Sequence, residues 1–128
     1  MGEIEADQLL RFIEIEPFTR LWKKHGLGDD DLLGLQYQIM LAPESGDVVP
    51  GTNGVRKFRF APPGVGKCGA FRVVYSYFPA HGTVLPWSVL GKGDRDNWNR
   101  AELNALAAMN ARAQQVLDRE KEDDARRA

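Results

Sequence analysis

The 128-residue chain has a single cysteine and lacks any apolar run of the length that crosses a bilayer. Cys68 has no second thiol to pair with, so an internal disulfide is excluded and a reducing cytoplasm is the expected location. Residues 1–12 lack the basic and apolar regions of a secretory signal peptide, so we expect none. These absences predict a cytoplasmic protein with no membrane partner.

Signatures of metal sites and activated nucleophiles are equally scarce. The two histidines, His25 and His81, do not show the Cys/His spacing that binds zinc. Cys68 has no neighbouring histidine in the sequence to activate it, which favours a structural thiol. We therefore expect no metal and no cofactor. We expect both histidines at the surface, with proton transfer by His81 as a minor alternative.

The chain does contain a strongly basic centre, which its net charge of −1 conceals. Residues 1–53 hold ten acidic and four basic side chains, residues 54–95 hold one and seven, and residues 96–128 hold seven and six. The three segments therefore carry net charges of −6, +6 and −1. A local positive field of this kind is what a polyanion such as RNA responds to.

Apolar spacing and turn residues predict four strands and three helices. In chain order these are a strand at 9–15, helices at 17–25 and 29–41, strands at 55–61, 70–78 and 83–90, and a helix that opens after Asn99. Residues 46–54 are rich in turn formers and predict a connecting loop. Pro86 removes a donor from the strand ladder, which predicts a bulge or an edge position there.

Helices that stand apart from consecutive, hairpin-linked strands are typical of an α+β domain with an antiparallel sheet. With 43% hydrophobic residues, the chain suffices for one core, so we expect a single domain spanning 1–128. Asn99 and Glu102 form a capping-box pattern at the start of the last helix. Because the final stretch of that helix is charged on all sides, we expect mobile ends at 1–8 and 118–128.

The basic centre gathers on one sheet face if the predicted strands pair. Strand alternation separates Lys57 and Arg59 from the neighbouring aromatic residues, and Arg72 can join these two cations from the next strand. Three cations this close repel one another unless an anion lies among them, which is the reason to suspect a phosphate site. A solvated sheet face whose charges protect an edge explains the same pattern, and both interpretations stay open.

Further candidate contacts flank this cluster. Lys67 belongs to a glycine-bearing loop, PPGVGK, which lacks the spacing of a P-loop but can still touch a phosphate. Trp98 follows Lys92 and Arg95, and aromatic side chains among cations commonly stack on bases. The same tryptophan precedes a helix cap, so a packing role for it stays open, whereas Trp87 is expected in the core.

The central run GDVVPGTNGVRKFRFAPPGVGKCGAFRVVYSYF, residues 46–78, resembles the signature stretch of the HigB branch of RelE/ParE-type toxins. Those proteins carry a G-D-x-I/V-P-G-T-x-G-x-R-K-x-R-W/F segment, a Gly/Lys loop and a G-x-R-V-x-Y-Y-x-F strand. The earlier run EPFTRLWKKHGLGDDDLLGLQ resembles their F-T-x-x-W/L start, and the resemblance covers about residues 10–115. It implies a RelE-like microbial-RNase-type fold, with an antiparallel sheet of about four strands, two N-terminal helices and a C-terminal helix.

The resemblance also implies the toxin of a type II toxin–antitoxin pair, a metal-independent endoribonuclease that cuts mRNA on the translating ribosome. In such enzymes the 2′-hydroxyl of the RNA attacks, which requires a base, cations for the phosphoryl oxygens and an acid. By position Lys57 is the implied base, helped to lose its proton by neighbouring cations, and Arg59 and Arg72 would hold the phosphate. The implied RNA-binding residues are Arg56, Lys67, Lys92, Arg95 and Trp98. The implied partners are the ribosome, mRNA and a cognate antitoxin of the helix-turn-helix type.

The chain departs from the family pattern at three places. Cys68 stands where relatives have a basic residue, Pro86 is atypical, and the segment LGKGDRDNW at 90–98 replaces a lysine-rich Y-A-K-N-x-K-E-D segment. No tyrosine lies in this segment, so a stacking or acid role there falls to Trp98 or to no residue.

Two alternatives to the nuclease therefore stay open. One is a ParE-like inhibitor of a topoisomerase, which would not need the cluster of Lys57, Arg59 and Arg72 for catalysis. The other is an inactive member that serves only to bind an antitoxin.

Overall fold

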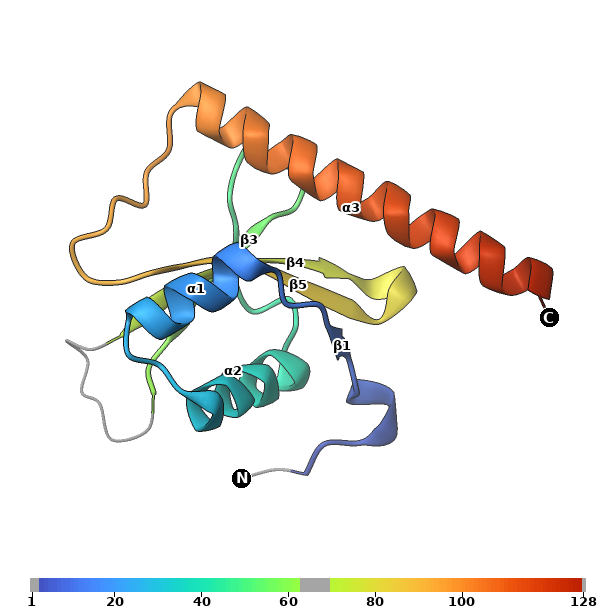
Figure 1. Ribbon diagram of the computed structural model, residues 1–128, viewed down its shortest axis with the longest axis horizontal. Helices are drawn as coiled ribbons and strands as arrows, with labels where there is room; N and C mark the ends of the chain where they lie inside the picture. Colours follow the sequence, from blue (N-terminus) through green and yellow to red (C-terminus); the bar gives the residue numbers. More distant parts are fainter. Residues whose placement is uncertain (1–2, 63–69, 128) are drawn as a thin grey trace.

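One sheet forms the middle layer of the molecule, and helices cover both of its faces (Figure 1). The computed structural model describes residues 3–62 and 70–127. The described residues form five strands in the order β1-β5-β4-β3-β2, and every neighbouring pair is antiparallel except β1 with β5. The α+β class predicted from the sequence is therefore confirmed.

The sheet has one strand more than the expected four, because two short edge strands flank three long ones. β1 (Arg11–Phe12) is much shorter than the strand predicted at 9–15, and it runs parallel to β5. β2 (Asp47–Val48) lies within the stretch predicted as a connecting loop, where it pairs with β3. Turn residues around β2 limit it to two residues, so its alternation is too short to be read from the sequence.

The three long strands match their predicted positions to within one residue. They are β3 (Arg56–Phe60), β4 (Phe71–Phe78) and β5 (Thr83–Leu90). Val74 pairs with Ser88, whereas the next residue along β4 pairs with Pro86. Trp87 is therefore an extra residue in the β4–β5 ladder, which confirms the bulge predicted from Pro86. The hairpin turn is a short 3-10 helix, η3 (Pro79–His81).

α1 (Glu16–Lys24) and α2 (Asp29–Leu41) match the two predicted N-terminal helices and pack on one face of the sheet. Pro17 lies in the first turn of α1, where the backbone N–H that it lacks would have no helical partner. Gly26, with a φ of 76°, supplies the left-handed residue that ends this helix. The core between helices and sheet consists of Phe18, Trp22, Leu27, Leu35, Ile39, Phe60, Val73, Tyr75, Val84 and Val89.

α3 (Arg100–Arg127) covers the opposite face and extends past the end of the sheet (Figure 1). It begins with the predicted capping box. The Glu102 backbone N–H donates to Asn99 Oδ1 at 2.8 Å, and the Asn99 N–H donates to Glu102 Oε1 at 3.0 Å. This cap fixes where the loop after β5 ends and the helix begins.

Buried polar contacts and a small apolar cluster attach α3 to the sheet. Ser76, which is 1% exposed, donates to Asn110 Oδ1 at 2.6 Å and accepts from Trp87 Nε1 at 2.7 Å. Farther along the helix, Leu117 packs against Phe78 on β4. Because buried hydroxyl groups need partners, Asn110 fixes the position of α3 above β4.

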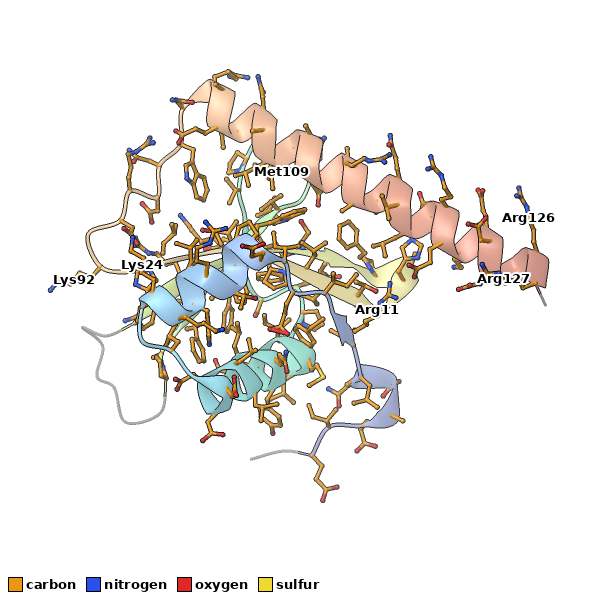
Figure 2. The ribbon with its side chains drawn as sticks, viewed as in Figure 1. Arg11, Lys24, Lys92, Met109, Arg126 and Arg127 are labelled. Atoms are coloured by element: carbon orange, nitrogen blue, oxygen red, sulfur yellow. The ribbon has the colours of Figure 1, made fainter. Side chains whose placement is uncertain are left out.

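The ends of the described chain are ordered into secondary structure. A 3-10 turn, η1, spans Ala6–Gln8, and α3 continues to Arg127. Arg11 forms an ion pair with Glu120 at 3.0 Å below the C-terminal half of α3 (Figure 2). The mobility expected for the ends stays a prediction. Among the described residues, no helix is long and apolar enough to cross a membrane.

Candidate functional site

Three basic side chains share the sheet face that α3 covers. Arg59 on β3 pairs directly with Arg72 on β4, and Lys57 lies two residues earlier on the same pleat, opposite Val74. This is the shared face that strand alternation predicts. The other pleat of β3 carries Phe58 and Phe60, which pack into the core beneath α1 and α2.

Arg59 and Arg72 line an open depression with a volume of about 420 Å³. Phe71, Lys92 and Asp94 lie on its wall as well, so the loop that follows β5 forms one of its sides. Lys92 projects outward from that loop (Figure 2). A phosphate group in the depression would therefore meet cations from β3, β4 and the loop.

An acidic side chain lies among the cations. Asp96 Oδ2 accepts a hydrogen bond from Arg72 Nη1 at 2.7 Å and one from Lys57 Nζ at 3.4 Å. The side chains of Lys57, Arg72 and Asp96 are 31%, 31% and 34% exposed, so the pairing is half-buried. The chain itself thus supplies the anion that three neighbouring cations require.

The Asp96 carboxyl is ionised at neutral pH. Desolvation by burial acts to raise its pKa, but the charges of Lys57 and Arg72, together with their hydrogen bonds, outweigh burial. The pKa of Asp96 therefore lies below its ordinary value of 3.8. A full negative charge stands between the two cations.

Arg72 also holds the loop that follows β5. Its Nη2 donates to the Gly91 carbonyl oxygen at 2.7 Å and to the Asp94 carbonyl oxygen at 3.4 Å. With the bond from Nη1 to Asp96, one planar guanidinium contacts the loop at three points. The conformation of this loop is therefore coupled to the orientation of Arg72.

Trp98 lies beside the cluster. Lys57 Nζ is 5.8 Å from the centroid of the Trp98 ring, which is within cation–π range. Trp98 also lines an apolar groove of about 310 Å³ between the sheet and α3, together with Trp87 and Met109. It therefore contacts the charged cluster on one side and an apolar groove on the other. This agrees with a packing role, and stacking on a base stays a prediction.

Both histidines are more buried than expected. The His25 side chain is 20% exposed, because its ring packs edge-on against Phe71 and its Nε2 lies 3.6 Å from Asp94 Oδ2. The His81 side chain is 7% exposed, and its Nε2 lies 2.8 Å from Asp118 Oδ1 on α3. The expectation of surface histidines is wrong, since each ring is packed against a neighbouring element.

Two of the remaining predicted RNA contacts, Arg56 and Arg95, form their hydrogen bonds away from the cluster. Arg56 lies on the opposite pleat, where its Nη1 donates to the carbonyl oxygens of Glu44 and Gly46, just before β2, each at 2.8 Å. Arg95 is exposed, and its Nη2 bonds Glu102 Oε2 at 2.8 Å. Both arginines are thus bonded away from Lys57. Lys67 and Cys68 lie outside the described residues.

No protein-family model matches the chain. A solved structure with a similar fold is that of the E. coli toxin RelE, determined as an arginine-to-alanine double mutant in the free state. The two chains are 16% identical, with a TM-score of 0.50, and the match covers 78% of this chain and 95% of that chain. The chain has a RelE-like fold. At this level of identity the similarity concerns the fold, and it leaves the HigB branch implied by the sequence as a proposal.

Within this RelE-like fold, sequence reasoning missed Asp96. A signal for it existed, because three neighbouring cations need an anion and the loop after β5 contains acidic residues at 94 and 96. The contact with Arg72 joins residues 24 positions apart in the chain, however, and strand or helix periodicity does not reach that far. Among the described residues, no group of three or more His, Cys, Asp or Glu side chains is placed to hold a metal ion.

Proposed function

We propose that this RelE-like protein is the toxin of a type II toxin–antitoxin pair and cleaves mRNA on the translating ribosome, which blocks translation. The observation that carries the proposal is the shared face of Lys57, Arg59 and Arg72 next to an open depression. The fold and the resemblance of residues 46–78 to the HigB branch support the same function.

In the proposed reaction, the 2′-hydroxyl oxygen of a nucleotide attacks the adjacent phosphorus and loses its proton to a base. The bond between phosphorus and the 5′-oxygen breaks, that oxygen takes a proton, and a 2′,3′-cyclic phosphate remains. Arg59 and Arg72 would stabilise the charge on the phosphoryl oxygens. Removal of a single donor of this kind typically lowers a rate by about 10²–10³.

Lys57 is the proposed base, and it can accept a proton only as the neutral amine. The Lys57 Nζ atom, which would take this proton, donates a hydrogen bond to Asp96 Oδ2 at 3.4 Å. The proposed chemistry therefore requires a change in the position of Asp96.

The proposed partners are mRNA, the ribosome and a helix-turn-helix antitoxin, and the proposed location is the cytoplasm. Lys92 and Trp98 lie next to the cluster and are proposed RNA contacts. Arg56, Lys67 and Arg95 stay predicted RNA contacts. An acidic segment of the antitoxin would complement the basic face.

A catalytically inactive, antitoxin-binding protein is the second candidate, and one observation favours it. Asp96 already pairs with Lys57 and Arg72, so two of the three proposed catalytic side chains are engaged within the chain. If this arrangement is permanent, the site cannot take a phosphate.

Induction in a bacterium, with genome-wide mapping of mRNA 5′ ends, tests the proposal. The wild-type chain should arrest growth and produce new, in-frame 5′ ends within coding regions. The triple variant Lys57→Ala/Arg59→Ala/Arg72→Ala should leave these ends at the level of uninduced cells, because all three proposed catalytic groups are removed.

A matched variant controls for the loss of three positive charges. Arg20→Ala/Lys24→Ala/Arg119→Ala removes three exposed cations outside the site, and it should cut like the wild type. Growth arrest by the wild type without in-frame cleavage would refute the nuclease function. Equal cleavage by the wild type and the site variant would refute the residue assignment.

A further inference from the structure

We propose that Asp96 is an internal competitor for the phosphate site, which holds Lys57 and Arg72 in the resting protein until a phosphate group of RNA displaces it. This inference rests on the proposed function, because it names what occupies the same cations before RNA arrives. In this proposal, the loop between β5 and α3 carries Asp96 and moves away from the cations when RNA binds.

The competing anion uses the donors that a phosphate would need. Asp96 Oδ2 lies 2.7 Å from Arg72 Nη1 and 3.4 Å from Lys57 Nζ, so one carboxylate oxygen bridges both cations. A phosphate oxygen is also negatively charged, and it accepts hydrogen bonds of similar length from arginine and lysine side chains. Lys57 and Arg72 lie on one pleat of β3 and β4, and Asp96 Oδ2 lies between their nitrogens. A phosphate that takes these two donors therefore competes with Asp96 for the same space.

Simultaneous binding of the Asp96 carboxylate and a phosphate group to the same cations is unfavourable. Asp96 is ionised at neutral pH, as its lowered pKa indicates, and a phosphodiester is negatively charged. Two like charges this close to each other repel, and they would share the same cations. The carboxylate must therefore move away when the phosphate binds to Lys57 and Arg72.

The loop can release Asp96 without unfolding either neighbouring element. At its start, the Gly91 N–H donates to Asp94 Oδ2 at 2.7 Å, so this turn is closed independently of Asp96. At its end, the capping box of Asn99 and Glu102 holds the first turn of α3. Between these anchors, Arg95 and Asn97 are exposed, and Asp96 and Trp98 are half-buried. Displacement thus costs two half-exposed ion pairs and leaves the sheet and helix intact.

RNA binding by Asp96→Asn tests the inference. Asparagine keeps the shape of the side chain and can still accept a hydrogen bond from Arg72, but it lacks the charge that competes with phosphate. The probe is a fluorescent single-stranded oligonucleotide that carries 2′-O-methyl groups throughout, so it cannot be cleaved. At about 50 mM salt, fluorescence anisotropy should show binding about 2- to 10-fold tighter than that of the wild type, the gain expected from releasing one or two half-exposed ion pairs.

Asp123→Asn is the matched control, because it removes the same charge from an exposed position near the end of α3. That position lies about 35 Å along the helix from its first residue, which is more than two Debye lengths at this salt concentration. The RNA affinity of Asp123→Asn should therefore equal that of the wild type. If Asp96→Asn and Asp123→Asn bind RNA with equal affinity, Asp96 does not compete with phosphate. If the triple site variant loses RNA binding in the same experiment, the proposed site is still supported.

A double-mutant cycle separates competition from a general effect on the loop. Asp96→Asn should have no effect on RNA affinity when Lys57, Arg59 and Arg72 are already alanine, because no cation remains to be released. A gain of the same size in that background would overturn the inference. Unchanged RNA affinity in the triple site variant would refute the proposed site, and the competitor role with it.

Thermal unfolding with inorganic phosphate provides a second measurement. Ligands that bind only the folded state raise the Tm, so phosphate should raise the Tm of Asp96→Asn more than that of Asp123→Asn. Equal Tm shifts for the two variants would count against the inference. This comparison stays valid if Asp96→Asn lowers the Tm itself, because each variant is its own reference.

Discussion

Arg72 combines a place in the candidate site with a structural contact. It stands opposite Arg59 on the sheet and bonds Gly91, Asp94 and Asp96 of the loop after β5. These bonds use the fork of the guanidinium, which presents several donors in one plane. A lysine has the same charge but a single terminal nitrogen, so it cannot reproduce this set of contacts.

Arg72→Lys should therefore lower mRNA cleavage although the charge is kept. We expect a decrease of roughly 100-fold or more, the size seen when one preorganised donor is lost. Arg119→Lys is the matched control, because Arg119 is an exposed arginine of α3 outside the proposed site, and it should cleave within a few-fold of the wild type. The measurement is the rate of appearance of cleaved transcript in a translation extract. Equal rates for the two variants would contradict the role of Arg72.

Gly91 is a position at which the loop passes close to another element. A Cβ atom built there would lie 2.7 Å from His25 Cε1 and 3.0 Å from His25 Nδ1. The ring cannot simply withdraw, since it also packs against Phe71 and faces Asp94. Glycine at this position is therefore required by close packing rather than by backbone conformation.

Gly91→Ala should lower the free energy of unfolding by about 1–3 kcal/mol, the usual cost of overpacking. In a His25→Ala background the same substitution should cost much less, because the ring that it meets is gone. Urea unfolding of the four proteins checks this prediction. An equal cost of Gly91→Ala in both backgrounds would show that the contact with His25 is not its cause.

At the scale of elements, the sequence predicted the strands and the helix cap that follow a regular or local pattern. It missed the short strands whose formation depends on individual tertiary contacts. The long strands β3, β4 and β5 alternate clearly, and their bounds were predicted to within one residue. The capping box at Asn99 is a local signal and was also found. β1 and β2 are two residues each, so they carry no period to detect, and their pairing is set by tertiary contacts.

The candidate site was likewise predicted only in part: its three cations were found and its aspartate was missed. Alternation and charge placed Lys57, Arg59 and Arg72 on one face, because both depend on the local pleat. The loop after β5 has no regular structure, so nothing in the pattern showed that Asp96 turns back onto the sheet. Contacts made by an irregular loop follow from three-dimensional packing.

Asn110 is the residue on which the docking of α3 most directly depends. Asn110→Ala leaves the buried Ser76 hydroxyl without its acceptor and should lower the free energy of unfolding by roughly 1–3 kcal/mol. Asn104→Ala, at an exposed position of the same helix, should leave stability unchanged or raise it by up to about 0.7 kcal/mol, because alanine favours helix. Urea unfolding measures both, and equal effects would show that the contact does not stabilise the docked helix.

At the scale of the whole molecule, the charge is arranged in segments that fold onto different surfaces. The basic segment at 54–95 forms most of the central sheet, whereas the acidic N-terminal segment provides α1 and α2 on the opposite face from the candidate site. α3 extends beyond the sheet and carries charges of both signs (Figure 1). A nearly neutral protein can thus present a basic site to RNA.

Stability should fall in acid, because three carboxyls at or near α3 have a lowered pKa. Bonds from Arg95 and from the Asn99 backbone lower the pKa of Glu102, and bonds from Gln114 and His81 lower that of Asp118. For Asp96, the charges of two cations outweigh the opposing effect of burial. Groups with a lowered pKa stabilise the fold above their ordinary values, here 3.8 to 4.5, and this contribution is lost as the pH falls through the lowered values.

Urea unfolding at about pH 7, 5 and 3 tests this dependence. The free energy of unfolding should change little through these groups between pH 7 and 5, and it should fall between 5 and 3. The variant Asp96→Asn/Glu102→Gln/Asp118→Asn should show a smaller fall over the same interval. An identical fall in both proteins would assign the acid sensitivity to other groups.

The most direct test of the proposed function is cleavage of mRNA in purified ribosome complexes stalled at a defined codon. The wild-type protein should cut the transcript only when ribosomes are present and leave a 2′,3′-cyclic phosphate. The Lys57→Ala/Arg59→Ala/Arg72→Ala variant should leave it intact. Intact transcript with the wild-type protein, or equal cleavage by the variant, would contradict a nuclease built on these three residues.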